Sequence, residues 1–198
     1  MKRLPIGILG SGKGSNCRAI LERICSGNLA AEARVIISDV LDSPILDIAR
    51  EFSVPNTYLP PGQFRTRLEP MAEKALVKIL RELGVELVVL AGFMRVLHAP
   101  MLTAFPKRIV NIHPSLLPKF PGLEAWKQAL EAGEKVTGCT VHFVDEKIDH
   151  GTVIAQRDVA ILPEDTPESL HARIQIAERE LYPAAIAEFC EKYAAANA

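Results

Sequence analysis

Residues 4–16 read LPIGILGSGKGSN, a short apolar run that passes directly into a turn rich in glycine. An apolar run of this length, bounded by glycine, is typical of a buried strand. Behind the turn, apolar residues recur at helical spacing, at Cys17, Ile20, Leu21, Ile24 and Cys25. Ser15 or Asn16 can cap that helix. The stretch therefore predicts a strand, a glycine turn and a helix over 15–26, the opening unit of an α/β fold.

The alternation of apolar runs and helical patterns continues along the chain. We expect strands at 34–38, 54–59, 86–91 and 108–113, and helices at 43–52 and 64–83. This order predicts an open, mostly parallel, twisted sheet that is flanked by helices. After a helix at 123–132, the apolar runs TGCTVHFV and TVIAQRDVAI are expected to add antiparallel strands to the sheet. A last helix is expected from Thr166 toward residue 192.

Length and composition indicate one compact domain that acts on small molecules. The chain has 198 residues and 48% hydrophobic content, enough for a single large core. Its 23 basic residues nearly balance 24 acidic ones, so we expect no nucleic-acid partner and no membrane binding. Four widely separated cysteines argue against a zinc site or a disulfide scaffold. Reduced thiols and a cytoplasmic location follow from this interpretation.

The glycine turn is the first candidate site. Gly10, Gly12 and Gly14 bring bare N–H groups and the positive end of a helix dipole together, where an anion is favoured by ~0.3–1 kcal/mol or more. The spacing is neither GxGxxG nor a Walker loop, although Asp39 after the second strand could bind a ribose. The residues alone leave three possibilities open: a dinucleotide phosphate, a substrate phosphate, and a tight turn without a ligand.

Asn111 and His113 are the second candidate site. They lie two residues apart on an expected strand, so their side chains point to the same face, and Pro114 favours extended backbone at His113. The end of a central strand is where ligands of open α/β sheets usually bind. The alternative is a strand end whose polar groups only satisfy the adjoining loop.

Two further stretches carry candidate residues. The loop DEKIDHG, residues 145–151, holds carboxylates and a histidine, but their spacing to His113 and His142 is not typical of zinc and we expect no metal. In AGFMRVL, residues 91–97, a strand is expected to end and turn into a helix. This segment offers an apolar wall and one cation, although core packing would explain the same residues.

Five stretches together resemble the folate-dependent formyltransferases, in the family's order and spacing and over nearly the whole chain: GSGKGSN, LVVLAGFMRVL, NIHPSLLPKFPG, TGCTVHFVDEKIDHG and ERELYP. Within the family, the resemblance is to members that formylate the amine of glycinamide ribonucleotide in purine biosynthesis, with 10-formyltetrahydrofolate as co-substrate. It implies a Rossmann-like formyltransferase fold over 1–198. Residues 1–105 would then form the phosphate-binding half, and residues 106–198 the catalytic half with the C-terminal helix.

The resemblance implies a catalytic set of Asn111, His113 and Asp149. As the amine adds to the formyl carbon, the formyl oxygen becomes an oxyanion, and losing one donor aimed at such an oxyanion costs ~2.7–4 kcal/mol in other enzymes. N–H groups of Asn111 and of a protonated His113 suit that task. Asp149 would favour the imidazolium and orient it, and is a candidate acceptor of the amine's proton.

The resemblance also assigns the binding residues, and gives the phosphate of the glycine turn to the ribonucleotide substrate. Its phosphate loop corresponds to Gly12, Lys13, Gly14, Ser15 and Asn16, and Glu178 to the carboxylate that holds the glycinamide end. Folate contacts correspond to Arg67, Met94, Arg95, Val96, Leu97 and Asn111. In the family the bond that corresponds to Leu117–Pro118 is often cis.

Three positions depart from the family's pattern. Lys13 stands where many members have a small polar residue, and its ammonium should strengthen phosphate binding. Glu124 and Trp126 stand where members often have histidine or aspartate and another histidine, which alters the rim of the site. Thr152 follows Gly151 where the common DxGP pattern has proline, so the closure of this loop is expected to differ.

Other functions are kept as alternatives. Relatives that formylate sugar amines or methionyl-tRNA share the chemistry, but the latter normally carry an added C-terminal domain. Formyltetrahydrofolate hydrolase uses water as acceptor and usually has an extra N-terminal domain. A dinucleotide-binding oxidoreductase would use the glycine turn and Asp39, and leave the Asn111 and His113 pair unexplained. A non-catalytic ligand-binding module would need no such pair. The oligomeric state, monomer or homodimer, stays open.

Overall fold

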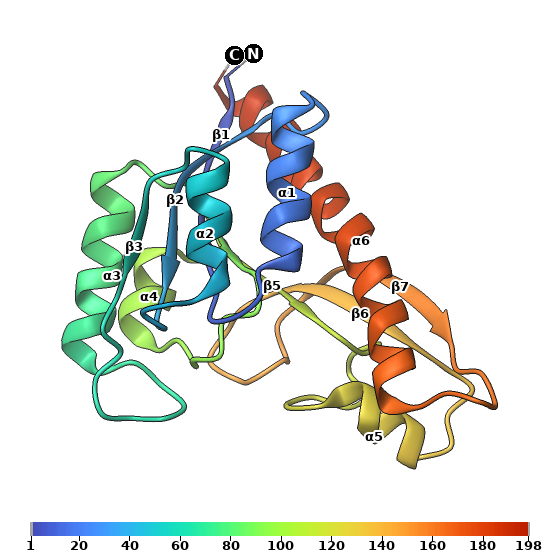
Figure 1. Ribbon diagram of the computed structural model, residues 1–198. Coiled ribbons are helices and arrows are strands. Elements are labelled where there is room, and N and C mark those ends of the chain that lie inside the picture. Colours follow the sequence, from blue (N-terminus) through green and yellow to red (C-terminus); the bar gives the residue numbers. More distant parts are fainter. Residues whose placement is uncertain (1, 198) are drawn as a thin grey trace.

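A seven-stranded sheet forms the centre of the computed structural model, which describes residues 2–197 (Figure 1). The strand order is β3-β2-β1-β4-β5-β6-β7, and the first five of these are parallel. The strands are β1 (Leu4–Leu9), β2 (Ala31–Ser38), β3 (Asn56–Tyr58), β4 (Leu87–Leu90), β5 (Ile109–His113), β6 (Val136–Phe143) and β7 (Val153–Ala160). Strands β6 and β7 pair antiparallel. The expected fold class is therefore confirmed.

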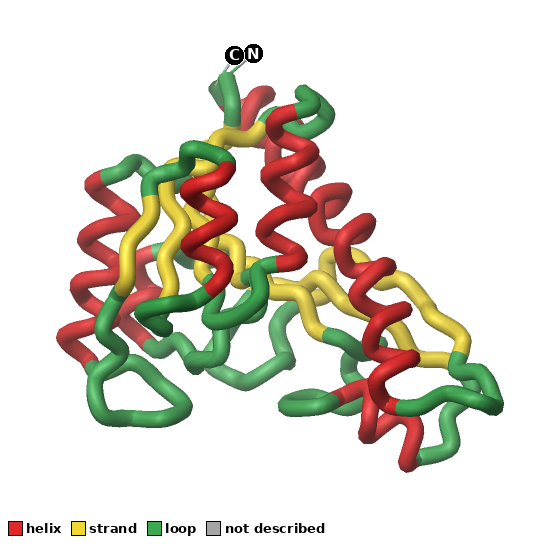
Figure 2. Tube along the Cα trace, viewed as in Figure 1, coloured by secondary structure: helices red, strands yellow, loops and turns green. Residues whose placement is uncertain are grey.

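Helices cover both faces of the sheet (Figure 2). One face packs against α1 (Ser15–Cys25), α2 (Pro44–Glu51) and the long α6 (Pro167–Ala196). The other packs against α3 (Pro70–Glu82) and α4 (Ala99–Ala104), while α5 (Ala125–Glu131) lies against α6. Within residues 2–197, no helix is both long and apolar enough to cross a membrane.

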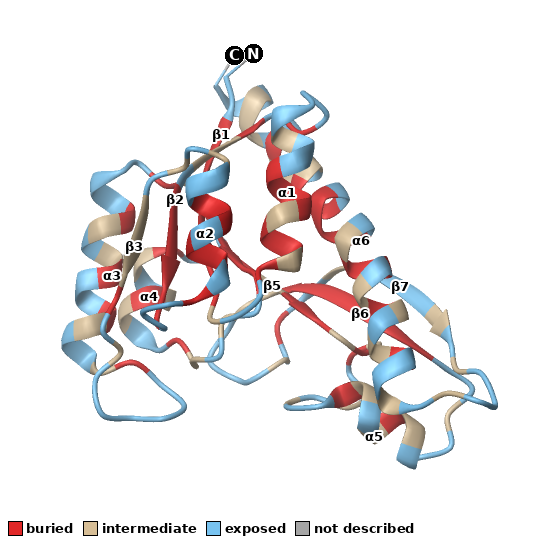
Figure 3. Cartoon of the chain, viewed as in Figure 1, coloured by how far each residue is buried: buried red, intermediate tan, exposed pale blue. Residues whose placement is uncertain are grey.

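Strand alternation divides the buried residues, coloured red in Figure 3, into two cores. On β5, Val110 and Ile112 belong to the core beneath α1 and α6, whereas Ile109 belongs to the core beneath α3 and α4. Because side chains of a strand alternate, Asn111 and His113 lie on the same face as Ile109. The predicted common face of these two polar residues follows directly from β5 being a strand.

Several expected boundaries were wrong, among them the start of β2 at Ala31, and two of them have a clear physical cause. The helix predicted over 64–83 begins only at Pro70, because the Val96 N–H donates to the Thr66 carbonyl (2.8 Å) and Arg67 forms a parallel bridge with Val96. The same pairing keeps residues 91–98 irregular, and α4 begins at Ala99. In both cases a contact between segments distant in sequence decides the backbone, which helical spacing cannot reveal.

All four cysteines are free thiols, as the sequence predicted. Cys17 and Cys139 are fully buried within the core shared by α1 and α6, and burial raises the pKa of each to about 12. These two thiols therefore act as small apolar side chains and are protonated at neutral pH.

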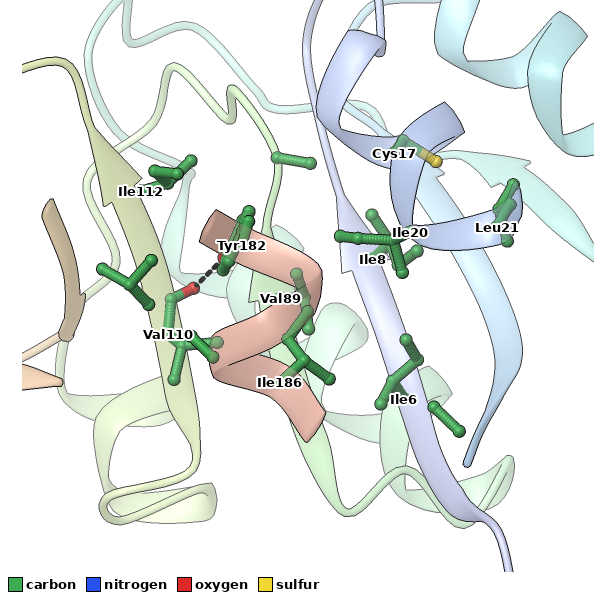
Figure 4. Close-up of a cluster of buried hydrophobic side chains, with 14 of the residues drawn as sticks. Ile6, Ile8, Cys17, Ile20, Leu21, Val89, Val110, Ile112, Tyr182 and Ile186 are labelled. Carbon is green, nitrogen blue, oxygen red and sulfur yellow. Dashed lines mark hydrogen bonds between the residues drawn. The ribbon is translucent and has the colours of Figure 1, made fainter. Parts of the chain in front are cut away.

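Tyr182 fastens α6 to the middle of the sheet (Figure 4). Its side chain is fully buried, and its hydroxyl lies 3.0 Å from the Leu90 carbonyl and 2.9 Å from the Val110 carbonyl. Burial raises its pKa well above the usual value, so the hydroxyl stays a donor. Leu90 ends β4 and Val110 lies near the start of β5, so this one group holds α6 against both of these central strands.

Replacing Tyr182 by phenylalanine leaves two buried carbonyls without this donor. We expect the free energy of unfolding to fall by about 1–3 kcal/mol, the usual penalty for an unsatisfied buried group. Urea titration measures the change. Tyr58→Phe is the control, because the half-buried Tyr58 hydroxyl makes no side-chain hydrogen bond within residues 2–197. Equal midpoints for both variants would contradict a role for the Tyr182 hydroxyl.

Candidate active site

The carboxyl ends of β1, β4 and β5 place the candidate residues along one edge of the sheet. These three strands are neighbours and run parallel, so the segments that follow them leave from the same edge. The glycine turn follows β1, the 91–98 segment follows β4, and His113 ends β5. The topology thus brings together three motifs that are as much as about a hundred residues apart.

The glycine turn is held in shape by the start of α2. The Gly12 carbonyl accepts from the Ser43 hydroxyl (3.1 Å) and the Ile45 N–H (3.2 Å). Gly14 has φ 71°, and a Cβ there would come within 3 Å of Ile45 and Ile48 side-chain atoms (2.9 and 2.8 Å). Glycine is thus required at position 14, and the turn presents the N-terminus of α1, with Lys13 exposed beside it.

Asn16 and Glu178 meet although 162 positions separate them. The Asn16 amide donates to Glu178 Oε2 at 3.0 Å, and Glu178 is only 7% exposed. Burial raises the pKa of the Glu178 carboxyl to about 7, with the Asn16 hydrogen bond acting in the opposite direction. The fold therefore places a carboxyl group that titrates near neutrality beside the glycine turn.

His113 and Asp149 form the centre of a polar cluster at the end of β5. His113 is 4% exposed, and its Nδ1 lies 3.3 Å from Asp149 Oδ2. Its Nε2 lies 2.8 Å from the Phe120 carbonyl, which can only accept a hydrogen bond. Because the carboxylate is also an acceptor, an imidazolium satisfies both neighbours. The same Asp149 oxygen accepts the Gly122 N–H at 2.8 Å, which fixes the carboxylate in the loop.

His142 joins this cluster, although the sequence left it without a role. It lies directly opposite Asn111 in the antiparallel β5–β6 pair, with His142 Nε2 3.4 Å from Asn111 Nδ2 and 3.6 Å from Asp149 Oδ1. Burial lowers the pKa of His142, and its Nδ1 faces the Phe143 carbonyl at 2.8 Å. A neutral ring that donates from Nδ1 therefore accepts from one Asn111 N–H and leaves the other free. Only the strand register, which the sequence does not state, reveals this partner.

A polar network supports the segment that follows β5. Thr140 donates to the Ser115 carbonyl (2.6 Å) and accepts the Leu117 N–H (3.0 Å), while Gln156 donates to the Leu117 carbonyl (2.9 Å). The Leu117–Pro118 peptide bond is cis, as the resemblance implied. Hydrogen bonds to β6 and β7 thus hold the loop that places the Phe120 carbonyl against His113.

The residues expected to bind folate lie together but differ in what their side chains face. Arg67 and Val96 are bridged, Met94 is exposed, and Leu97 is buried in the core beneath α3 and α4. The Arg95 Nε donates to Asp39 Oδ2 at 2.6 Å. The side chains of Leu97 and Arg95 therefore pack against the protein and hold the segment in place. Arg67 and Met94 are exposed, and Val96 is half-buried.

The contacts of Asp39 weigh against the dinucleotide alternative. Its Oδ2 binds Arg95, and its Oδ1 accepts from the Ser11 hydroxyl at 2.5 Å. Both carboxylate oxygens are occupied by the protein, and the side chain is 2% exposed. A ribose hydroxyl would have to displace one of these partners.

The rim carries the departures from the family's pattern. Trp126 stacks on His171 of α6 with ring centroids 3.7 Å apart and planes 2° from parallel, whereas Glu124 is largely exposed. Across residues 2–197, no group of three or more histidine, cysteine, aspartate or glutamate side chains is arranged to hold a metal ion.

Fold and site together define an α/β protein whose candidate site lies where parallel strands end. Residues 4–186 match the Formyl transferase family. Phosphoribosylglycinamide formyltransferase of Bacillus subtilis is 40% identical over 179 residues, which cover 90% of this chain and 91% of that protein. The chain belongs to the formyl transferase family.

Other relatives agree with this assignment. Glycinamide ribonucleotide transformylase 1 from Symbiobacterium toebii has a similar structure, with a TM-score of 0.92, 47% identity, and coverage of 96% of this chain and 89% of that one. The trifunctional purine biosynthetic protein adenosine-3 of Drosophila melanogaster is 44% identical over 188 residues, which are 94% of this chain but only 14% of that protein.

The raised pKa of Glu178 predicts a pH-dependent stability. The folded state holds its proton up to about pH 7, whereas an ordinary glutamate loses it near 4.5. The native state therefore loses stability as pH rises between these values, by up to about 3 kcal/mol in total. We expect Glu178→Gln to match the wild type below pH 4.5 and to be the more stable protein at pH 8, as measured by urea unfolding.

Glu191→Gln is the control for this experiment, since Glu191 lies on the exposed side of the same helix. Its unfolding free energy should follow that of the wild type across the pH range. A Glu178→Gln variant whose advantage does not grow with pH would show that burial does not perturb this carboxyl.

Proposed function

We propose that this protein transfers the formyl group of 10-formyltetrahydrofolate to the amine of glycinamide ribonucleotide, a step of purine biosynthesis. Membership of the formyl transferase family and the names of its relatives support this activity. The observation that carries it is the cluster of Asn111, His113 and Asp149 at the end of β5, on the edge of the sheet that also holds the glycine turn.

In the proposed reaction, the amine nitrogen bonds to the formyl carbon and the formyl oxygen becomes negatively charged. The free N–H of Asn111 and an N–H of His113 stabilise that oxyanion. The His113–Asp149 pair takes up the proton that the amine loses, and a proton passes to the folate nitrogen as its bond to the formyl carbon breaks. Asp149 lies against the imidazole and orients it, and His142 sets the plane of the Asn111 amide.

His113 Nε2 is occupied by the Phe120 carbonyl in the free protein. A formyl oxygen that uses this N–H takes the place of the carbonyl, so the loop over 114–122 shifts when the substrates bind. Phe120 has φ 55°, a backbone conformation that is unfavourable for a bulky residue, which makes a shift at this point less costly.

The ribonucleotide binds at the phosphate-binding half, residues 1–105. Its phosphate accepts hydrogen bonds from the loop over 12–16, and Lys13 adds a positive charge. Glu178 holds the glycinamide end, and Asn16 orients that carboxyl through its 3.0 Å hydrogen bond. A carboxyl with a pKa of about 7 is half ionised near neutral pH, so a substrate ammonium would draw it toward the charged form.

The folate lies along the 91–97 segment and reaches the catalytic half, residues 106–198, at Asn111. Met94 and Val96 line its ring system with backbone groups of Arg95 and Leu97, and Arg67 faces its acidic tail. Both substrates are small molecules, and the four free thiols fit a reducing cytoplasm.

An acceptor competition assay tests the activity. The purified protein is supplied with 10-formyltetrahydrofolate and either glycinamide ribonucleotide, an amino sugar nucleotide, methionyl-tRNA or no acceptor. We expect release of tetrahydrofolate with the ribonucleotide alone, together with the formylated product. Preference for another amine would assign the chain to a different activity of the family, and release without an acceptor would make it a hydrolase.

The catalytic roles predict a loss of turnover without a matching loss of binding. His113→Ala and Asp149→Asn are each expected to lower kcat by about 10²–10⁴-fold, the range for general acid–base groups, with both Michaelis constants changed only slightly. Asp145→Asn is the control in the same loop, because Asp145 is exposed and only accepts the Lys147 N–H. Variants that lose binding but keep kcat would contradict these roles.

Lys13→Ala tests the phosphate site. A hydrogen bond to a charged group contributes about 1.5 kcal/mol or more, so we expect the Michaelis constant for the ribonucleotide to rise about tenfold and that for the folate to stay unchanged. Lys78→Ala on the exposed face of α3 is the matched loss of one charge. An unchanged ribonucleotide constant would place the phosphate elsewhere.

A further inference from the structure

Ser11, Asp39 and Arg95 form a polar cluster between the two substrate segments, in which Asp39 is buried and the other two are half-buried. Each follows one of three adjacent strands: Asp39 follows β2, Ser11 follows β1, and Arg95 lies beyond β4. The Arg95–Asp39 pair is 2.6 Å long, with side chains 15% and 2% exposed. Two ion pairs of the adjoining helices α1 and α2, Arg18–Glu51 and Arg50–Asp47, are far more exposed.

Arg95 also holds the loop that carries Arg67. Its Nη1 donates to the carbonyls of Phe64 (2.5 Å) and Arg65 (2.6 Å). The guanidinium group therefore ties three backbone segments together: its own, the end of β2 and the 64–69 loop. Because these nitrogen atoms already bond to the protein, the Arg95 side chain acts on the folate segment by holding its backbone in place.

Ser11 links the same segment to the phosphate loop. Its hydroxyl donates to Asp39 Oδ1 (2.5 Å) and accepts the Met94 N–H (2.9 Å), and its own N–H donates to the Gly92 carbonyl (3.0 Å). Ser11 immediately precedes Gly12 of the phosphate loop. A single residue thus connects the turn after β1 to the backbone on both sides of Phe93.

The partners of this cluster argue for positioning. A buried ion pair adds little to stability, because the loss of solvation of both charges offsets their attraction, and a well-packed apolar pair is often as stable. What a fully bonded pair does provide is a fixed geometry. Here each hydrogen bond from Ser11 and Arg95 ends on Asp39 or on a segment that faces a substrate, and the hydrophobic cores take no part.

We propose that Ser11, Asp39 and Arg95 are positioning residues that lock the folate-binding segment 92–97 to the phosphate loop. The cluster sets the distance between the two substrates, so that the formyl carbon lies within reach of the amine. This inference rests on the proposed function. It assigns Asp39 the role of anchor for the folate wall and gives Arg95 its effect through the backbone of its own segment.

Asp39→Asn and Ser11→Ala test the lock in the full-length protein. Each is expected to raise the Michaelis constant for 10-formyltetrahydrofolate about tenfold, because the segment must be ordered at the expense of folate binding, while kcat at saturation changes less than about threefold. Calorimetry should show a matching rise in the Kd for tetrahydrofolate. Asp47→Asn, which removes the charge of an exposed aspartate paired with Arg50, should leave both values unchanged.

A double variant separates positioning from stability. Asp39→Asn combined with Arg95→Gln removes both charges, so the melting temperature should return toward that of the wild type. Because a glutamine at position 95 is too short to bridge position 39 and the carbonyls of Phe64 and Arg65, the folate Kd should stay raised. Recovery of both the melting temperature and the folate Kd would reduce the cluster to a structural ion pair and overturn the proposal, as would unchanged Michaelis constants in the single variants.

The outcomes for the two proposals can be told apart. If the wild type binds tetrahydrofolate but forms no formylated ribonucleotide, the proposed function fails, and the folate Kd of the variants still decides whether the cluster positions the segment. If the wild type transfers formyl groups and the variants match it in both Kd and Michaelis constant, only the positioning role fails. A wild type that binds no folate overturns both.

Discussion

The pairing of β4 with β5, in which Leu90 lies opposite Asn111, is the constraint on which the site depends. It fixes how far β5 extends beyond its neighbour, so that Asn111 and His113 emerge beside the segment that follows β4. The same edge receives the glycine turn, because β1 pairs with β4 on its other side. Tyr182 holds this arrangement in place by bonding to the carbonyls of both Leu90 and Val110. A slip of one residue in this register would turn Asn111 and His113 toward α6 and break up the candidate site.

The site concentrates polar groups that are costly to bury. His113, Asp39 and Glu178 are each less than a tenth exposed, and each has protein partners that compensate its lost solvation. The compensation is least complete at Glu178, whose pKa rises to about 7 because one amide cannot replace water around a carboxylate. Such an under-solvated group is poised to gain from a cationic ligand, and the free protein gives up stability to keep it there.

The sequence sufficed for the fold class and for most strands and helices, because strand and helix periodicities are local signals. The spacing of Asn111 and His113 was enough to place both on one face, and Gly14 had a steric reason that a turn pattern already suggested. The sequence could not predict the start of α3, the irregular 91–98 segment or the contacts of Asp39. Each is decided by a contact between distant segments: Val96 with Thr66, and Asp39 with Ser11 and Arg95. His142 enters the site only through the β5–β6 register.

The departures from the family's pattern on the phosphate side fit one another physically. Trp126 covers the ring of His171, and both this burial and the nearby charge of Lys13 lower the pKa of that histidine. The neutral form of His171 is therefore favoured beside the Lys13 side chain at this end of α1. A lysine introduced beside a histidine that could still ionise would repel it. Burial under Trp126 and the charge of Lys13 thus both disfavour a second positive charge at this end of α1.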